Sequence, residues 1–543
     1  MATVNKKSYS RLRSTIETAF FRNNIRNVDN LKEAYEMAKD SPGTIVTDQA
    51  VYGAETIGLE KDSKVLLFND GSITGRYKDA RVVLGEPGID SEKYASILRD
   101  AMYQSRYSSH WAATSYIGLD EEFMLKARLL ITEGNENLVY NWLLNFQYVN
   151  EEYKALYNKS TVHDEEDILI YSNPDWYHPE HPCGLAIFDP DNNCAAILGL
   201  KYFGEHKKGS LTLAWNVGRK LGYAPCHGGI KEFTLGDDEK YVMSFFGLSG
   251  SGKSTLTHHK HNNKYETKIL HDDAFVISTE DGATIALEPS YFDKTQDYPE
   301  GCEDNKYLLS VQNCGARMNE DGKVVLVTED IRNNNGRAIK SVLWKENRVN
   351  KFDRSIDSIV WITKDPALPP VLKVSDPVLA ATFGATLATK RSSAERIKEG
   401  ASYNDLVIEP YANPFRTYAL SEDYAKFKYL FENMDVDCYV INTGSFVEKD
   451  VNKEVTIEAI ERIVEGRAEF KPFGYLENME YLDFDGFNPE FDNEDYDELL
   501  KNSIKIRIDY LKKMMVERQG IDSLPVETIN ALEKFLAKRK KAA

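Results

Sequence analysis

Short apolar runs alternate with polar, glycine-containing segments along this chain, a pattern typical of proteins that combine strands and helices. Two apolar runs flanking a polar turn at residues 189–193 predict neighbouring strands. The predicted strands span residues 167–171, 184–188, 194–200, 241–246, 323–327, 358–362 and 437–442. Residues 123–146 carry apolar side chains at helical spacing, which predicts a helix. We therefore expect an α/β fold.

A chain of 543 residues is too long for one ordinary core, so two large lobes are expected. From Pro472 the composition becomes aromatic and acidic, then helical, and it ends in the basic run at residues 538–541. The expected domains are a mixed α/β domain at 1–236, a second domain at 237–475 and a docked helical extension at 476–543.

Composition narrows the classes of partner. A formal net charge of −19 argues against general nucleic-acid binding and against an anionic membrane surface. The six cysteines form no C-x-x-C pair, and no apolar run approaches the ~20 residues that cross a bilayer. The start of the chain leads into no signal-peptide core. We expect a cytoplasmic protein, a monomer or a small homo-oligomer, that binds small molecules in a local positive pocket.

The strongest motif is a complete P-loop, G-x-x-x-x-G-K-S, directly after the apolar run at 241–246. Its glycines let successive backbone N–H groups converge on phosphate oxygens, and the following residues can open a helix whose N-terminus favours anions. The lysine can reach the terminal phosphates, and the serine hydroxyl can bind a divalent cation. The expected nucleotide-binding residues here are Gly247, Leu248, Ser249, Gly250, Ser251, Gly252, Lys253, Ser254 and Thr255.

A second strand-like run, residues 268–271, ends in the two carboxylates Asp272 and Asp273. A P-loop nucleotide needs a carboxylate near its metal, supplied from the end of a neighbouring strand. We therefore expect the pair to lie near the P-loop rather than in a solvated turn.

Upstream lie Y-F-G-E-H-K-K-G at residues 202–209 and a lone histidine, His227. These segments, then F-F-G-L-S-G-S-G-K-S and D-D, resemble the phosphoenolpyruvate carboxykinase family in order and spacing, and weaker similarity extends over about residues 66–466. The resemblance implies that Lys208, His227 and Asp273 bind a transition metal, Mn²⁺, with Lys208 neutral. It also implies that Asp272 and Ser254 hold the Mg²⁺ of the nucleotide, and that Lys207 neutralises the transferring phosphoryl group.

The resemblance extends to substrate contacts. Arg76, in T-G-R, would bind the substrate carboxylate, and Tyr202 would lie against the enolpyruvate. Arg337, in N-G-R, would contact phosphoryl and carboxylate groups; Lys294 would lie near the nucleotide, and Thr456 at its edge. The catalytic residues would thus be Lys207, Lys208, Lys253 and Arg337.

The implied reaction converts oxaloacetate and ATP into phosphoenolpyruvate, ADP and CO₂, a lyase step of gluconeogenesis. Phosphoryl transfer depends mainly on positioning and charge neutralisation, which lysines, arginine and two metals supply. The loop resembles that of the ATP-dependent branch of the family, whereas the GTP-dependent branch has a reactive cysteine in this loop, so ATP is expected. Residues 1–236 would then form the substrate-binding domain and residues 237–475 the nucleotide-binding domain, with the active site in the cleft between them. Residues 386–395 resemble the mobile lid of the family.

Some positions depart from the family pattern. Tyr77 and Lys78 follow Arg76 where S-P-K is usual, and Lys449 stands near the position of an expected G-K-R segment. Two alternatives therefore stay open: a kinase of the same architecture that acts on another carboxylate or hydroxyl substrate without decarboxylation, or a nucleotide-binding regulator without catalysis.

One further segment, His178-Pro-Glu180-His181-Pro-Cys183, has residue types that can bind metals. Its two prolines indicate a turn, and a fourth ligand is not evident, so a structural loop is the expectation.

Overall fold

The computed structural model describes residues 10–69, 80–236, 239–248, 250–329, 336–390, 406–474 and 478–540. Its Cα positions divide into two compact units. Unit 1 contains the chain up to Val217 together with Leu287–Glu346, and unit 2 contains Gly218–Ala286 and most of the chain from Asn347 onward. This division differs from the single change of domain expected at residue 236, because residues 287–346 pack with the first part of the chain.

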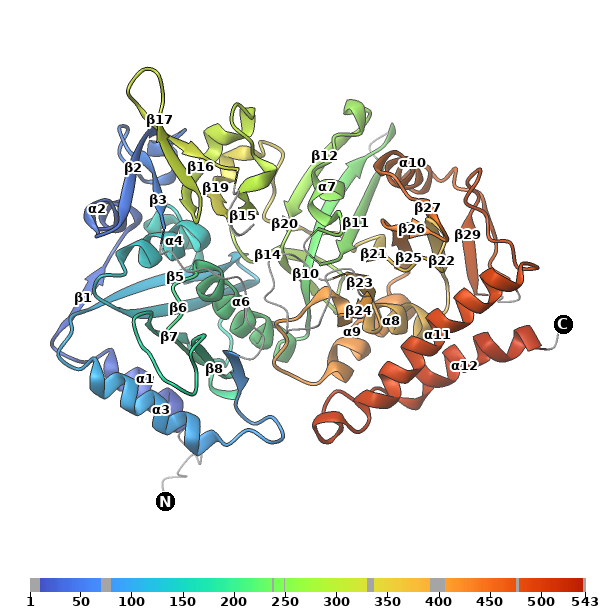
Figure 1. The fold of residues 1–543 in the computed structure, drawn as a ribbon, viewed down its shortest axis with the longest axis horizontal. Helices are drawn as coiled ribbons and strands as arrows, with labels where there is room; N and C mark the ends of the chain where they lie inside the picture. The colour runs from blue at the N-terminus through green and yellow to red at the C-terminus, as the bar shows by residue number, and fades with distance from the viewer. Residues whose placement is uncertain are drawn as a thin grey trace. The chain divides into compact units, whose positions relative to one another are not determined.

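Unit 1 contains two large sheets (Figure 1). The first has seven strands in the order β1 (Ile25–Val28), β5 (His110–Asp120), β6 (Phe123–Thr132), β7 (Ile168–Asn173), β9 (Cys194–Leu198), β8 (Leu185–Asp189) and β4 (Arg81–Val83). The second has five, in the order β15 (Tyr291–Lys294), β19 (Arg337–Lys340), β16 (Leu308–Gln312), β3 (Lys64–Phe68) and β2 (Thr44–Ala50). A separate hairpin joins β17 (Gly315–Met318) to β18 (Val324–Val327).

Helix α1 (Arg11–Ala19) of unit 1 buries one apolar face. In this helix, Leu12, Ile16 and Ala19 recur at helical spacing and are buried, and the Ser10 side chain accepts a hydrogen bond from the first turn. The other helices are α2 (Leu31–Asp40), α3 (Ser91–Gln104), α4 (Glu136–Phe146), α5 (Asn150–Lys159) and α6 (Phe203–Lys220), the last of which crosses from unit 1 into unit 2.

Unit 2 is built on an 11-stranded mixed sheet. Its path runs through β20 (Lys351–Phe352), β14 (Thr284–Ala286), β13 (Ala274–Ser278), β10 (Tyr223–Thr234), β11 (Lys240–Phe246), β21 (Ser358–Thr363), β25 (Asp437–Asn442), β22 (Val371–Val374), β29 (Met479–Leu482) and β28 (Phe470–Pro472), with β12 (Glu266–His271) paired to β10. Strands β11, β21 and β25 are parallel, so the segments that follow them leave the sheet at one edge.

The helices of unit 2 are α7 (Lys253–His258), α8 (Pro377–Ala385), α9 (Leu420–Asn433), α10 (Lys453–Val464), α11 (Glu494–Met514) and α12 (Val526–Lys540). Two short hairpins, β23 (Ala388–Lys390) with β24 (Leu406–Ile408) and β26 (Ser445–Phe446) with β27 (Lys449–Asp450), complete the unit. Helix α11 is attached by the buried ion pair of Arg507 with Asp365, whose charged atoms are 2.7 Å apart. Helices α11 and α12 belong to unit 2.

The sequence predicted the strands well and one helix poorly. The apolar runs at 241–246, 358–362 and 437–442 are confirmed as β11, β21 and β25, and the predicted neighbouring strands are confirmed as the antiparallel pair β8 and β9. The helix expected over residues 123–146 is wrong in its first half, which is strand β6. This strand lies between β5 and β7 with most side chains buried on both faces, so it lacks the polar alternation of a half-exposed strand.

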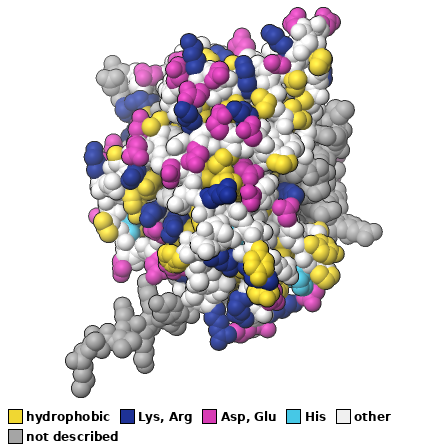
Figure 2. All heavy atoms as spheres, turned by 90° about the vertical axis from the view of Figure 1, so that its left-hand side faces the viewer, with side chains coloured by type: hydrophobic (Ala, Val, Ile, Leu, Met, Phe, Trp, Pro, Cys, Tyr) yellow, Lys and Arg dark blue, Asp and Glu magenta, His cyan; other side chains and the backbone are white. Residues whose placement is uncertain are grey.

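The face drawn in Figure 2 shows acidic and basic side chains intermixed, with apolar side chains scattered among them. Among the described residues, no helix has both the length and the apolar character that a membrane span needs.

Candidate active site

The glycine-rich loop of unit 2 connects β11, which ends at Phe246, to α7, which begins at Lys253. Gly252 has a φ of 99°, in the left-handed region that favours glycine. A side chain at Gly247 has no room, since its Cβ would lie 2.2 Å from Ser251 Oγ and 3.1 Å from Ile362 Cβ. The expected strand–loop–helix arrangement is present, and Ser254 and Thr255 are exposed on the first turn of α7.

Two side chains from neighbouring strand ends hold this loop. The Thr443 hydroxyl, just beyond β25, donates to the Ser251 carbonyl at 2.8 Å. Lys364 Nζ, just beyond β21, donates to the Gly250 carbonyl at 3.0 Å. Burial lowers the pKa of Lys364, and the positive charge of Lys390 adds to the effect. These two contacts connect the loop backbone to the ends of β21 and β25. Its predicted role in phosphate binding stays a prediction.

Asp273 lies at the centre of a small charged cluster in unit 2. Its Oδ1 is 3.0 Å from His227 Nε2 and 3.5 Å from Lys253 Nζ. The sheet creates this proximity: His227 on β10 is paired in register with Ala274 on β13, the residue after Asp273. The buried His271 imidazole accepts hydrogen bonds from the backbone N–H groups of Asp273 and Ala274, which fixes the turn.

The environment of His227 fits a metal ligand. Its Nδ1 lies 2.5 Å from the Ala412 carbonyl oxygen, a contact that requires a proton on Nδ1. In a neutral ring Nε2 then presents a lone pair, and this lone pair would face the Asp273 carboxylate at 3.0 Å. Two acceptors at that distance need a proton or a cation between them. A carbonyl that fixes the far ring nitrogen is the usual second contact of a metal-bound histidine.

Asp272 is buried and points toward the end of α7, where its Oδ2 is 3.2 Å from His258 Nε2. Burial opposes ionisation of this carboxyl, but the contact with His258 and the charge of Lys253 outweigh it and hold its pKa well below the usual range. Asp272 is therefore an anion beside Lys253, the state that binding a cation requires.

In unit 1, Lys207 and Lys208 lie on the first turns of α6. Lys207 is fully buried, with its Nζ 2.9 Å from Glu288 Oε1, and Asn145 Nδ2 donates to Glu288 Oε2 at 2.6 Å. Lys208 is partly exposed, with its Nζ 5.5 Å from the ring centre of Trp215. The two adjacent lysines thus occupy very different environments, which the sequence did not predict.

The second sheet of unit 1 brings Lys294 and Arg337 together as a cross-strand pair of β15 and β19. Burial lowers the pKa of Lys294, and the adjacent Arg337 lowers it further. Tyr202 contacts the same strand through Phe292, with ring centres 6.3 Å apart. Two cations forced side by side create a local positive region, as an anionic ligand would need.

The remaining predicted residues are placed as follows. Thr456 is buried on the first turn of α10, and its hydroxyl donates to the Asn452 carbonyl at 3.3 Å. Arg76, Ser249, residues 391–395 of the expected lid and the side chains of the terminal basic run lie outside the described residues. The predicted site residues are divided between the two units. Unit 1 contains Tyr202, Lys207, Lys208, Lys294 and Arg337. Unit 2 contains the glycine-rich loop, His227, Asp272, Asp273 and Thr456. Their shared site stays a prediction.

Several partners of these residues could not be found from sequence. These partners contact the predicted residues only in the folded chain and belong to no local motif. They are Glu288, His258, His271 and Lys364.

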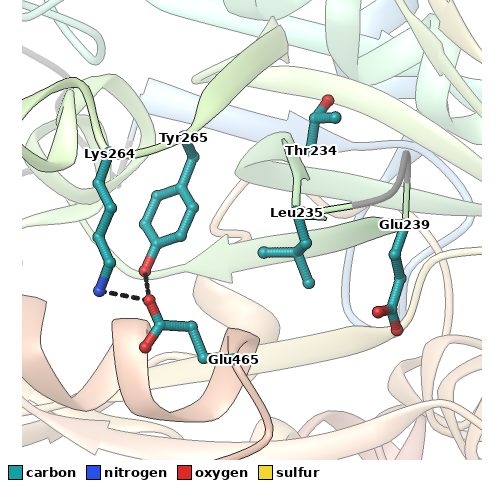
Figure 3. Close-up of a pocket in the computed structure, with 7 residues that line it drawn as sticks. Thr234, Leu235, Glu239, Lys264, Tyr265 and Glu465 are labelled. Atoms are coloured by element: carbon teal, nitrogen blue, oxygen red, sulfur yellow. Dashed lines mark hydrogen bonds and ion pairs between the residues drawn. The ribbon is translucent and has the colours of Figure 1, made fainter.

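A separate pocket of about 460 Å³ opens near Thr234, at the C-terminal end of β10 (Figure 3). Lys264 and Tyr265 both reach the Glu465 carboxylate there. Burial opposes ionisation, but hydrogen bonds from Lys264, Tyr265 and Arg467 lower the Glu465 pKa to about 2. The described lining residues of this pocket differ from the predicted site residues.

A family model described as phosphoenolpyruvate carboxykinase matches residues 73–490 of this chain. The phosphoenolpyruvate carboxykinase (ATP) of Christiangramia forsetii is 24% identical over 464 residues, 78% of this chain and 80% of that protein. That of Aeropyrum pernix is 24% identical over 315 residues, 55% of this chain and 63% of that protein. The glycosomal enzyme of Trypanosoma brucei brucei is 27% identical over 252 residues, 43% and 48% of the two chains. The last two matches thus span about half to two thirds of those relatives.

Proposed function

Because this chain belongs to the phosphoenolpyruvate carboxykinase family, we propose that it converts oxaloacetate and ATP into phosphoenolpyruvate, ADP and CO₂. The active site would lie in a cleft between the substrate-binding and nucleotide-binding domains. In this reaction the carbon–carbon bond to the leaving carboxylate breaks, and the resulting enolate oxygen takes the γ-phosphoryl group of ATP.

The observation that carries the proposal is the cluster around Asp273. One carboxylate oxygen lies 3.0 Å from the His227 imidazole and 3.5 Å from Lys253, the lysine of the glycine-rich loop. One carboxylate oxygen is thus shared by a histidine and the lysine of the glycine-rich loop. If His227 and Asp273 bind a metal and Lys253 binds phosphate, this arrangement would hold a metal ion beside a triphosphate, as phosphoryl transfer needs.

The proposal assigns the remaining roles. His227, Asp273 and Lys208 would hold Mn²⁺, and Asp272 with Ser254 would hold the Mg²⁺ of ATP. Bound there, the metals supply positive charge that stabilises the enolate and the phosphoryl group. Lys253 and the loop backbone would bind the β- and γ-phosphates. Arg76, Tyr202 and Arg337 would orient the substrate, and Lys207 would neutralise the transferring group.

The test is product analysis with oxaloacetate, ATP and Mn²⁺. We expect phosphoenolpyruvate, ADP and CO₂ in equal amounts, with oxaloacetate and Mn²⁺ alone as the control for background decarboxylation. A phosphorylated product without CO₂ would instead support a kinase of the same architecture. Tight ATP binding without either product would reduce the chain to a nucleotide-binding protein.

Matched variants separate the metal site from general damage. His227→Ala and Lys208→Ala should each lower turnover by at least about 100-fold while ATP affinity changes far less, since the loop is intact. His163→Ala and Lys39→Ala, which alter residues that have no role in the proposed reaction, should leave turnover unchanged. Unchanged turnover in His227→Ala would remove the metal assignment.

A further inference from the structure

A second group of metal-ligating side chains lies in unit 1, in the segment that connects β7 to β8. One ligand atom each of His178, Glu180 and His181 lies within 4.8 Å of the others. The segment is a tight turn, in which the His181 N–H donates to the His178 carbonyl at 2.9 Å. Pro179 and Pro182 restrict the backbone on either side of Glu180 and His181. The three side chains are therefore brought together before any ligand binds.

Aromatic contacts fix the direction of both imidazole rings. Trp176 is buried in the core of unit 1 and stacks on His178, with ring centres 5.5 Å apart and planes 13° apart. Tyr94 on α3 lies against His181, with ring centres 6.2 Å apart. Rings held in this way lose little conformational entropy when they bind a metal, which favours affinity.

One nitrogen of the His181 ring is buried without a hydrogen bond to the described residues. This nitrogen is Nε2. A buried and unpartnered imidazole nitrogen costs free energy, which a bound cation would recover.

Glu180 supplies the negative charge and is already in contact with a cation. Its Oε2 lies 2.9 Å from Lys93 Nζ, and both side chains are largely exposed. Its backbone N–H donates to His178 Nδ1 at 3.2 Å, which is a long hydrogen bond. This hydrogen bond would be lost if His178 bound the metal through Nδ1. Lys93 thus competes with a metal for the carboxylate, but only with the small free energy of an exposed ion pair.

We propose that His178, Glu180 and His181 form a binding site for a divalent transition metal of the Zn²⁺ type, with water in the remaining position. Two imidazoles and one carboxylate with an open position are a ligand set that Zn²⁺ accepts. The site would tie the β7–β8 connection to α3 through its neighbours Trp176 and Tyr94. It is independent of the proposed function, since none of its residues has a role in that reaction.

The experiment uses the full chain carrying His227→Ala, which weakens the family metal site, after removal of metals by chelation. Co²⁺ serves as the probe because its visible absorption reports low coordination number and nitrogen ligands. We expect one equivalent of Co²⁺ to produce these bands and Zn²⁺ to abolish them. Absence of bands in this protein would overturn the proposal.

Variants in the same background identify the ligands. His181→Ala should weaken Co²⁺ binding by at least about 100-fold, more than the 10–100-fold typical of residues that only support a ligand. Lys93→Met should tighten it about two- to fivefold by releasing Glu180. His163→Ala is the matched control in unit 1 and should bind as the parent does. Parent-like titration of a folded His181→Ala protein would contradict the site.

Discussion

The buried pair of Lys207 and Glu288 provides a test that separates structural from catalytic roles. Both side chains have no exposed surface, and their charged atoms are 2.9 Å apart. At an effective dielectric constant of about 20 their attraction is about 6 kcal/mol. Lys207→Met removes the cation and leaves the Glu288 carboxylate buried with Asn145, so we expect a loss of about 3–5 kcal/mol in unfolding free energy.

The double variant Lys207→Met with Glu288→Gln removes both charges and keeps an acceptor for Asn145 Nδ2. Its stability, followed by urea unfolding, should return to within about 1–2 kcal/mol of the parent. If Lys207 also neutralises the phosphoryl group, turnover of the stable double variant should stay at least about 100-fold low. Restored stability with full turnover would refute the catalytic role, and equal stability of the single and double variants would refute the ion-pair argument.

Two further perturbations address the loop and a buried acid. Gly247→Ala should weaken ATP binding at least about tenfold in calorimetric titrations, because the new Cβ would lie 2.2 Å from Ser251 Oγ and displace the loop. Asp423→Asn should change the pH dependence of stability. Burial raises the Asp423 pKa to about 7, although Arg416 and the Tyr418 hydroxyl lower it, so the folded state binds an extra proton between about pH 4 and 7. Parent stability should therefore fall as pH rises through this window, and the variant should lack this fall of up to about 4 kcal/mol in urea unfolding.

Each of these has a matched comparison. A Cβ at Gly236 would meet no atom within 4 Å, so Gly236→Ala should bind ATP as the parent does. Normal ATP affinity in Gly247→Ala would show that the loop does not bind phosphate. For Asp423, the difference in unfolding free energy between the parent and Asp423→Asn is compared at pH 5 and pH 8. If this difference is the same at both pH values, Asp423 does not titrate in this range.

The strands of unit 2 could be predicted because their apolar runs are short and bounded by turn residues. The run at 437–442 coincides with β25, and the run at 241–246 with all but the first residue of β11. Residues 123–132 could not be assigned, since a strand buried on both faces has no period that distinguishes it from a buried helix. The packing of residues 287–346 with the first part of the chain depends on long-range contacts, which no local sequence pattern encodes.

For the candidate site, sequence motifs identified residues but not their partners. The structure brings Lys253 and His227 to Asp273. The resemblance had implied one metal site for His227 and Asp273, and the aspartate pair was expected near the glycine-rich loop. Their roles in binding stay predictions. The Ala412 carbonyl that fixes the His227 ring and the Glu288 carboxylate that pairs with Lys207 depend on tertiary contacts. A motif reports chemical types, whereas protonation and charge balance depend on what packs around them.

The central claim is that Lys208, His227 and Asp273 bind one Mn²⁺ beside the ATP phosphates. The most direct measurement is a crystal structure of the chain with Mn²⁺ and a non-hydrolysable ATP analogue, with data collected at the manganese absorption edge. We expect an anomalous peak within bonding distance of Lys208 Nζ, His227 Nε2 and an Asp273 oxygen. A Mn²⁺ peak that is not bonded to His227 or Asp273, with Lys208 pointing into solvent, would contradict this metal site.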